Sequence, residues 1–180
     1  MARKTVSLIA AVLWVGLLFL APAVAQERVL VNGFDADYPP FSFVDKNGKP
    51  AGFDIDALDW IAKEMGFKVK HQPTDWAAIV PTLQAKKIDI IASGMSITPE
   101  RQAAVNFTEP YWTVQQRLVV RADSNLTPQQ CLEPGRKIAL LRGSAESKWM
   151  TENLLKKGYA FELKAYDTTP LAIEDVANGR

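Results

Sequence analysis

Short apolar runs alternate along the chain with segments in which apolar residues recur every three or four positions. Residues 28–34 hold the run VLV and pass into Asn32-Gly33, which predicts a buried strand. Residues 54–65 carry apolar side chains at helical spacing, so we expect a helix capped by Asp54 and ended by Gly66. Strands that alternate with helices at this spacing indicate βαβ units. The pattern predicts an α/β fold with a mostly parallel sheet.

The same periodicities predict the other elements. Asp45-Lys46-Asn47-Gly48 separates two short apolar segments, and its Asn-Gly pair predicts a β-hairpin. Pro81 would break a helix interior, so the second helix should begin near Ile79, with Trp76 on the loop before it. Further strands are expected at 67–71, 88–92, 117–120, 137–141 and 160–165, and further helices at 79–87, 145–157 and from Thr169-Pro170 to Ala177. The pattern restarts near residue 117, which suggests two α/β modules, residues 26–114 and 115–180.

The first 25 residues have the layout of a secretory signal peptide. Arg3 and Lys4 precede an almost uncharged apolar run, residues 6–20, and Ala23-Val24-Ala25 provides a small-x-small cleavage site. The run is short for a membrane span of about 20 residues, which disfavours a retained anchor. We expect residues 1–25 to be removed and the mature chain to be periplasmic, without membrane insertion.

Charge and composition favour no nucleic-acid or membrane partner. The chain has 21 basic and 20 acidic residues, and removal of Arg3 and Lys4 with the leader leaves 19 and 20. Cys131 is the only cysteine, so an internal disulfide is excluded and a buried thiol is favoured over an intermolecular bridge. His71, the only histidine, is expected to pack within a strand. The sequence therefore predicts neither a metal site nor a cofactor.

Ligand sites in open α/β sheets lie at the carboxyl ends of the strands, so the loops after the strands are the candidate site. The first loop, residues 34–41, contains Tyr38 beside two prolines that stiffen the turn, a suitable wall for stacking. Trp76, after the second expected strand, could form the opposite wall. Both rings could instead be ordinary packing residues, and the two interpretations of Tyr38 are equally supported.

Arg101 lies where a helix disfavours positive charge. Thr98 is the expected cap and Pro99 the first helical residue, which places Arg101 near the positive end of the helix dipole. The preceding loop, residues 93–97, is rich in small residues that let a ligand approach the backbone. A guanidinium pairs bidentately with a carboxylate. That carboxylate belongs either to a ligand or to the protein, for example to Glu100. The neighbouring residues, taken alone, slightly favour a protein carboxylate as the partner of Arg101.

In the second module, Arg142-Gly143-Ser144-Ala145 joins an expected strand to an expected helix. Free N–H groups at a helix N-terminus can bind an anion. The segment could also be a plain turn, with Ser144 acting only as the helix cap. Arg142 either faces the ligand, where it would favour an acidic or amide side chain, or lies at the edge of the module.

Four segments of the first module carry a family resemblance: DADYPPFSF, GFDIDALDWIAKEMG, IVPTLQAKKIDIIASGMSITPER and VNFTEPYW. They resemble the first lobe of the bacterial extracellular solute-binding proteins, family 3, which include the periplasmic amino-acid receptors of ABC importers. The resemblance covers about residues 28–180 and is densest through Trp112. It implies a periplasmic-binding-protein fold of two α/β lobes, which closes on an amino acid and delivers it to a membrane permease. The expected protein is a monomer without covalent chemistry.

The resemblance implies a role for Arg101, which would grip the α-carboxylate of the amino acid with help from Ser96. Ser93 would offer its carbonyl to the α-ammonium, and the segment 142–145 would close over the carboxylate from lobe 2. Many family members carry a hydroxyl where this chain has Ala145, so only the N–H would serve here.

The ligand side chain would lie between Tyr38 and Trp76, and Asp35 would contact its polar groups. The full ligand-binding set that the resemblance implies is Asp35, Tyr38, Trp76, Ser93, Gly94, Ser96, Arg101, Arg142, Ser144 and Ala145.

Family members continue past the position of Arg180 into another lobe 2 strand, whose aspartate binds the α-ammonium, and then return to lobe 1. The resemblance therefore implies a fragment or a truncated product with an incomplete second lobe and weak binding.

Two alternatives to a transport receptor stay open. An exported cyclohexadienyl (prephenate or arogenate) dehydratase-like enzyme would need a general acid in the cleft, and only Asp35 in the ligand loops could serve. A ligand-sensing domain of a membrane receptor would need a downstream membrane span, and none follows residue 20.

Overall fold

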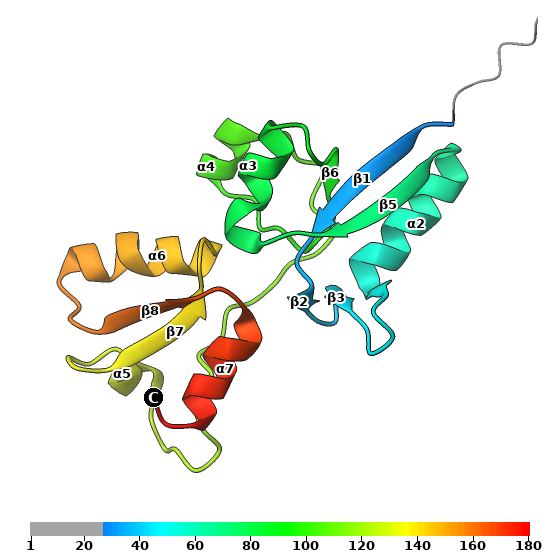
Figure 1. Ribbon diagram of the computed structural model, residues 1–180. Coiled ribbons are helices and arrows are strands. Elements are labelled where there is room, and N and C mark those ends of the chain that lie inside the picture. The colour runs from blue at the N-terminus through cyan, green and yellow to red at the C-terminus, as the bar shows by residue number, and fades with distance from the viewer. Residues whose placement is uncertain (1–26) are drawn as a thin grey trace, which may run out of the picture.

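A parallel sheet of three strands forms the centre of the first half of the chain (Figure 1). The computed structural model describes residues 27–180, so the expected signal peptide lies outside the described residues. The strands are β1 (Val29–Phe34), β5 (Lys68–Pro73) and β6 (Ile90–Ile91), in the order β5-β1-β6. The strands expected at 28–34 and 67–71 are confirmed, whereas the one expected at 88–92 pairs over only two residues. All three carboxyl ends meet at one edge of the sheet.

Helix α2 (Phe53–Met65) packs against β5, and its capping differs from the prediction. The N-cap is Gly52, and the N–H groups of Phe53 and Asp54 donate instead to the carbonyls of Pro40 and Phe41, at 2.9 and 2.8 Å. Gly52 has φ 117°, and a Cβ there would lie 2.5 Å from the carbonyl oxygen of Phe41. The loop before the helix therefore replaces a side-chain cap.

A small antiparallel sheet carries the loop that precedes α2. Its strands are β2 (Asp37–Tyr38), β3 (Ser42–Val44) and β4 (Pro50–Ala51). The expected hairpin is confirmed: the Gly48 N–H donates to the Asp45 carbonyl at 2.9 Å.

Two short helices complete this half, α3 (Ile79–Gln84) and α4 (Pro99–Ala104). Trp76 is not on a plain loop, because it begins the 3-10 turn η1 (Trp76–Ala78), whose N–H groups bond to the Asp75 carboxylate. Helix α3 ends before the expected Lys87, because Lys86 adopts a positive φ of 57°. We call residues 27–104, which are built on the first sheet, the first unit.

The second half is built on a parallel pair, β7 (Lys137–Leu141) and β8 (Glu162–Tyr166). Its other elements are α5 (Pro128–Cys131), α6 (Ala145–Asn153), the 3-10 turn η2 (Leu155–Lys157) and α7 (Thr169–Ala177). Leu140, Met150 and Phe161 form its buried core, and Cys131 is buried, as favoured from the sequence. We call residues 128–177 the second unit.

One helix of the second unit departs from its expected end. Helix α6 stops at Asn153, and the chain continues as a 3-10 turn instead of helix to Lys157. Helix α7 runs from Thr169 to Ala177 as expected, and its cap is Thr168, whose hydroxyl accepts a hydrogen bond from the Leu171 N–H.

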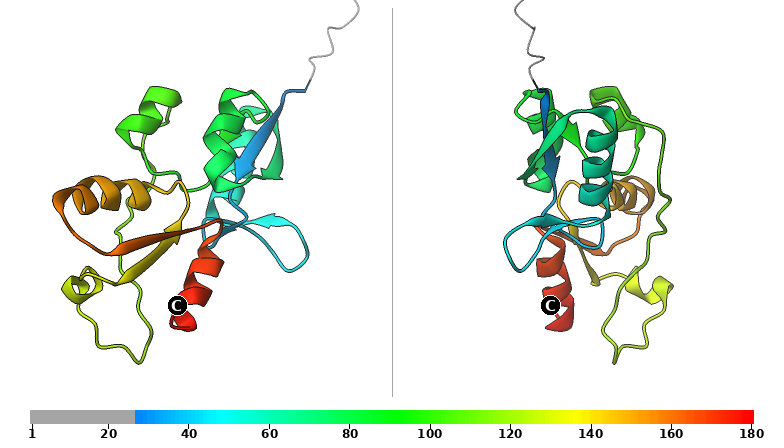
Figure 2. Two further views of the ribbon diagram at one scale, coloured as in Figure 1. Left: turned by 60° about the vertical axis from the view of Figure 1, so that its left-hand side comes forward. Right: turned by 90° about the vertical axis from the view of Figure 1, so that its right-hand side faces the viewer.

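Residues 105–127 join the two units as a long segment without helix or strand (Figure 2). The strand expected at 117–120 is absent, because no described strand runs beside it to complete a ladder. Within residues 27–180, no helix combines the length and apolar character that crossing a membrane requires.

Candidate functional site

The loops after β1 and β6 are tied together at the carboxyl edge of the first sheet. The Ser93 hydroxyl accepts a hydrogen bond from the Asp35 N–H at 2.9 Å and lies 2.8 Å from the Ser42 hydroxyl. Ser42 in turn donates to the Asp35 carbonyl at 2.9 Å. All three residues are buried, so these side chains fix the loops. The expected role of Ser93 uses its carbonyl and not this hydroxyl, and it stays a prediction.

Gly94 lies directly against the ring of Tyr38. Its φ is 56°, and a Cβ at this position would lie 2.8 Å from Cε1 of Tyr38. Tyr38 stacks on Phe41, with ring centroids 5.4 Å apart and an interplanar angle of 21°. The structure therefore brings together Asp35, Tyr38, Ser93 and Gly94 as the sequence predicts.

Arg101 bridges the two units. Nη1 donates to the Ser96 carbonyl at 3.0 Å, and Nη2 donates to the Gly143 carbonyl at 3.1 Å. The expected cap Thr98 is confirmed, because its hydroxyl accepts from the Arg101 N–H at 3.2 Å. Burial lowers the pKa of Arg101, while the charges of Glu146 and Glu100 act in the opposite direction.

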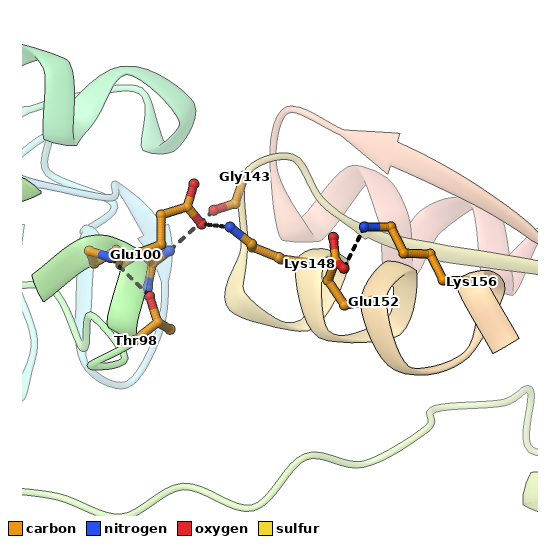
Figure 3. A network of polar contacts seen from close by, with 7 residues as sticks. Thr98, Glu100, Gly143, Lys148, Glu152 and Lys156 are labelled. Carbon is orange, nitrogen blue, oxygen red and sulfur yellow. Dashed lines mark hydrogen bonds and ion pairs between the residues drawn. The ribbon is translucent and has the colours of Figure 1, made fainter. Parts of the chain in front are cut away.

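Arg101 forms no ion pair with any carboxylate of residues 27–180. Glu100, the suggested protein partner, pairs with Lys148 of α6 instead, as Figure 3 shows. The guanidinium lies over the ring of Trp76, with Cζ 5.3 Å from the ring centroid. Its direct contacts are two neutral carbonyls and an aromatic face, and Glu146 and Glu100 act on its charge without pairing with it, so the guanidinium is available to an anion.

The segment expected to close over a ligand, residues 142–145, joins β7 to α6. Gly143 lies against the first unit, where a Cβ would be 3.5 Å from Cα of Ala77. Ser144 is buried and caps α6, its hydroxyl accepting from the Ser147 N–H at 3.1 Å. Ala145 is the first residue of α6. Ser144 therefore acts as the helix cap, which was one of the two predicted alternatives.

Arg142 is not brought to the other candidate residues. Its Nε donates to the Asp167 carboxylate at 2.9 Å and its Nη2 to the Ala165 carbonyl at 3.3 Å. Both partners belong to the second unit, and both side chains of the ion pair are exposed. Of the two predicted positions of Arg142, this ion pair favours the edge of the module, because a carboxylate of its own unit neutralises the guanidinium.

Asp54 is a further candidate site residue, which sequence reasoning did not single out. Taken there as a helix cap, it is 3% exposed, and its Oδ1 accepts a hydrogen bond from the Tyr111 hydroxyl at 2.7 Å. Its Oδ2 has no hydrogen-bond partner and would lie 3.8 Å from a Cβ on Gly94. Burial raises the pKa of Asp54, although the Tyr111 hydroxyl and the nearby Gly94 N–H act to lower it. An aspartate in a first helical turn looks like a cap in sequence, so only the long-range contact with Tyr111 reveals it.

A parallel α/β sheet with candidate ligand loops at its carboxyl edge, joined to a second α/β unit at an arginine, defines a protein of the periplasmic-binding type. The chain belongs to the bacterial extracellular solute-binding proteins, family 3, whose model matches residues 30–172. The family resemblance and the fold class expected from the sequence are thereby confirmed.

Relatives and solved structures agree with this membership. The chain is 32% identical over 159 residues to an L-arginine-binding protein of Pseudomonas aeruginosa, covering 88% of this chain and 61% of the relative. It is 35% identical over 175 residues to the lysine/arginine/ornithine-binding periplasmic protein of Escherichia coli, covering 97% and 66%. The structure of an ancestral amino acid-binding protein, a precursor of cyclohexadienyl dehydratase, matches with a TM-score of 0.77 and 40% identity, covering 84% and 66%. The chain thus spans less than two thirds of the length of these proteins.

Proposed function

We propose that this protein is the solute-binding component of an amino-acid ABC importer, which captures an amino acid in the periplasm for a membrane permease. Residues 26–114 and 115–180 would be its first lobe and part of its second, and their boundary would fall within the long segment 105–127. The family membership supports this function, and so does the similarity to relatives that are amino-acid-binding proteins.

The observation that carries the proposal is the state of Arg101. The half-buried guanidinium donates hydrogen bonds to the carbonyls of Ser96 and Gly143, and it forms no ion pair with a carboxylate of the described residues. An α-carboxylate is the ligand group that supplies the missing charge, and charge-assisted pairs are the stronger kind of hydrogen bond. The α-carboxylate would therefore bind where the two units meet.

The neighbouring loops suit the rest of an amino acid. Ser93 and Gly94 present backbone at the edge of the sheet, and Tyr38 lies beside them. Closure by rigid-body motion of two units around a ligand is the usual behaviour of two-lobed receptors. Contacts of Arg101 and Glu100 with the second unit are of the kind such closure would make and break.

An amino-acid panel measured by thermal shift tests the proposal. We expect at least one of the common amino acids to raise the unfolding temperature of the wild type, because a ligand that binds only the folded state stabilises it. Arg101→Ala should abolish the shift. Arg28→Ala, which removes an exposed arginine at the opposite end of β1, should retain it.

Two results would contradict the proposal: no shift with any amino acid, or an unchanged shift in Arg101→Ala. The dehydratase alternative is tested by incubation with prephenate, and product formation would favour it. The ancestral protein that is a precursor of cyclohexadienyl dehydratase is itself an amino acid-binding protein, and its similarity to this chain supports binding over catalysis.

A further inference from the structure

We propose that Asn32 and His71 are positioning residues for the candidate ligand loop that follows β6, residues 92–94. Asn32 holds the Ala92 N–H, and His71 holds the amide of Asn32 in the orientation that this contact needs. The inference rests on the proposed function, because the loop meets a ligand only if the protein captures an amino acid. The hydrogen bonds themselves are tested without a ligand.

The side chain of Asn32 takes over where the strand pairing of β6 ends. The pairing of β6 with β1 covers Ile90 and Ile91, so Ala92 lies just beyond it. The Ala92 N–H donates to Oδ1 of Asn32 at 2.8 Å. Asn32 is completely buried. A backbone donor shielded from water needs an acceptor, so Asn32 fixes the backbone at the point where the loop begins.

This contact also fixes the tautomer of His71. Because Oδ1 of Asn32 accepts from a backbone N–H, the atom that faces His71 is Nδ2, which can only donate. Nδ2 lies 3.0 Å from Nδ1 of His71, so Nδ1 is the acceptor and carries no proton. The neutral ring then carries its proton on Nε2, which donates to Oδ1 of Asp59 at 2.9 Å. One chain of hydrogen bonds thus runs from Ala92 through Asn32 and His71 to α2.

Asn32, and not Asp59, sets this tautomer. The side chain of His71 is 9% exposed and that of Asp59 is 59% exposed, so water can replace Asp59 as the acceptor of the Nε2 proton. The buried amide of Asn32 has no such substitute. The imidazole ring also meets the edge of the buried Phe34 ring, with centroids 6.3 Å apart and an interplanar angle of 82°. The ring is therefore held with Nδ1 toward Asn32.

The loop that this chain of hydrogen bonds holds carries two of the candidate site residues. Ser93 follows Ala92 directly and offers the carbonyl that we expect to accept from the α-ammonium. Gly94 comes next and lies against the ring of Tyr38. Groups that contact a ligand need support that holds them to within about 0.5 Å, so a shift of Ala92 should weaken binding. Asn32 and His71 thus act on the ligand through the loop.

NMR of the imidazole nitrogens reads the tautomer, because protonated and unprotonated ring nitrogens differ in chemical shift. His71 is the only histidine of the chain, so its ring signals need no assignment. We expect the proton on Nε2 in the wild type and in Asp59→Ala. Asn32→Asp should place a proton on Nδ1, because a carboxylate can only accept. A proton on Nδ1 in the wild type, a changed tautomer in Asp59→Ala, or an unchanged one in Asn32→Asp would overturn the inference.

Hydrogen exchange at the Ala92 N–H reads the positioning. His71→Leu removes the acceptor of the Asn32 amide, whereas His71→Asn has a similar size and keeps an oxygen close to the place of Nδ1. We expect exchange at Ala92 to accelerate at least about tenfold in His71→Leu and less than about threefold in His71→Asn. The Thr74 N–H, which donates to the Phe34 carbonyl at 2.9 Å, is the internal reference in the same sheet. Equal acceleration at Thr74 and Ala92 would show a merely structural role and overturn the inference.

Calorimetry connects the loop to the ligand, with L-arginine as the first probe and then the amino acid that gives the largest thermal shift. His71→Leu should weaken binding by about three- to tenfold, the equivalent of one hydrogen bond, and His71→Asn should restore most of the loss. Unchanged affinity in His71→Leu, with faster exchange at Ala92, would overturn the role in binding alone. Binding of no amino acid by the wild type would overturn the proposed function, whereas the tautomer and exchange results would still decide whether Asn32 and His71 hold the loop.

Discussion

Arg101 donates a hydrogen bond from Nη2 to the Gly143 carbonyl at 3.1 Å, so an arginine of the first unit is held by backbone of the second. Gly143 has φ 72° and lies against Ala77, which brings its carbonyl close enough to accept. The charged group that would bind the α-carboxylate is thus also a contact between the units. In the proposed function, ligand binding and closure would be coupled through this one side chain, because both would depend on where the guanidinium lies.

The ion pair between Glu100 and Lys148 should bias the units toward each other (Figure 3). Glu100→Gln or Lys148→Ala should increase their mean separation, measured by energy transfer between dyes on α2 and α6. Both side chains are more than half exposed, so the closed population should fall by no more than about fivefold and the effect should vanish in high salt.

Lys156→Ala is the control for the ion pair between Glu100 and Lys148. Lys156, in η2, pairs with Glu152 of α6 at 2.5 Å and does not reach the first unit, as Figure 3 also shows. An equal change in Lys156→Ala and Lys148→Ala would mean that positive charge in the segment of α6 and η2, not the pair with Glu100, sets the separation.

Gly94→Ala should destabilise the first unit by roughly 2–3 kcal/mol, from positive-φ strain of about 1 kcal/mol plus overpacking against the Tyr38 ring. Gly48→Ala isolates the first contribution, since Gly48 has φ 76° and nothing lies within 4 Å of its Cβ position. Urea denaturation measures both. Equal free energies of unfolding for the two variants would refute the close contact between Gly94 and Tyr38.

Stability should depend on pH through Asp54. Burial raises its folded-state pKa above the ordinary value of 3.8. At pH values between 3.8 and the raised pKa, the folded state therefore holds more protons than the unfolded state. The free energy of unfolding should therefore fall as pH rises through that window, and this contribution should be absent in Asp54→Asn. Denaturant titrations at several pH values give the slopes. Parallel pH profiles for the wild type and Asp54→Asn would contradict the raised pKa.

The sequence predicted the parts of this fold that depend on local pattern. The strands of the first sheet, the hairpin turn at Asn47-Gly48 and the Thr98 cap each follow from neighbouring residues. The segment 117–120 has strand composition but is not a strand, because a strand requires a partner that local pattern does not specify.

The same limit applies to the candidate site. The sequence offers both Arg142 and Arg101 as candidate cations for a ligand, but Asp167 neutralises one and no described carboxylate pairs with the other. Asp54 looked like a cap because its distinguishing contact, with Tyr111, lies 57 residues away. Pairings over such distances are set by tertiary structure, so they could not be predicted from spacing.

The most direct test of the central claim compares arginine with agmatine, its analogue without the α-carboxylate, in calorimetric titrations of the wild type and Arg101→Ala. If Arg101 binds the α-carboxylate, the wild type should prefer arginine by roughly 2–5 kcal/mol, the cost of removing one member of a buried charge pair. Arg101→Ala should lose that preference. A preference for arginine over agmatine that is unchanged in Arg101→Ala would contradict the account.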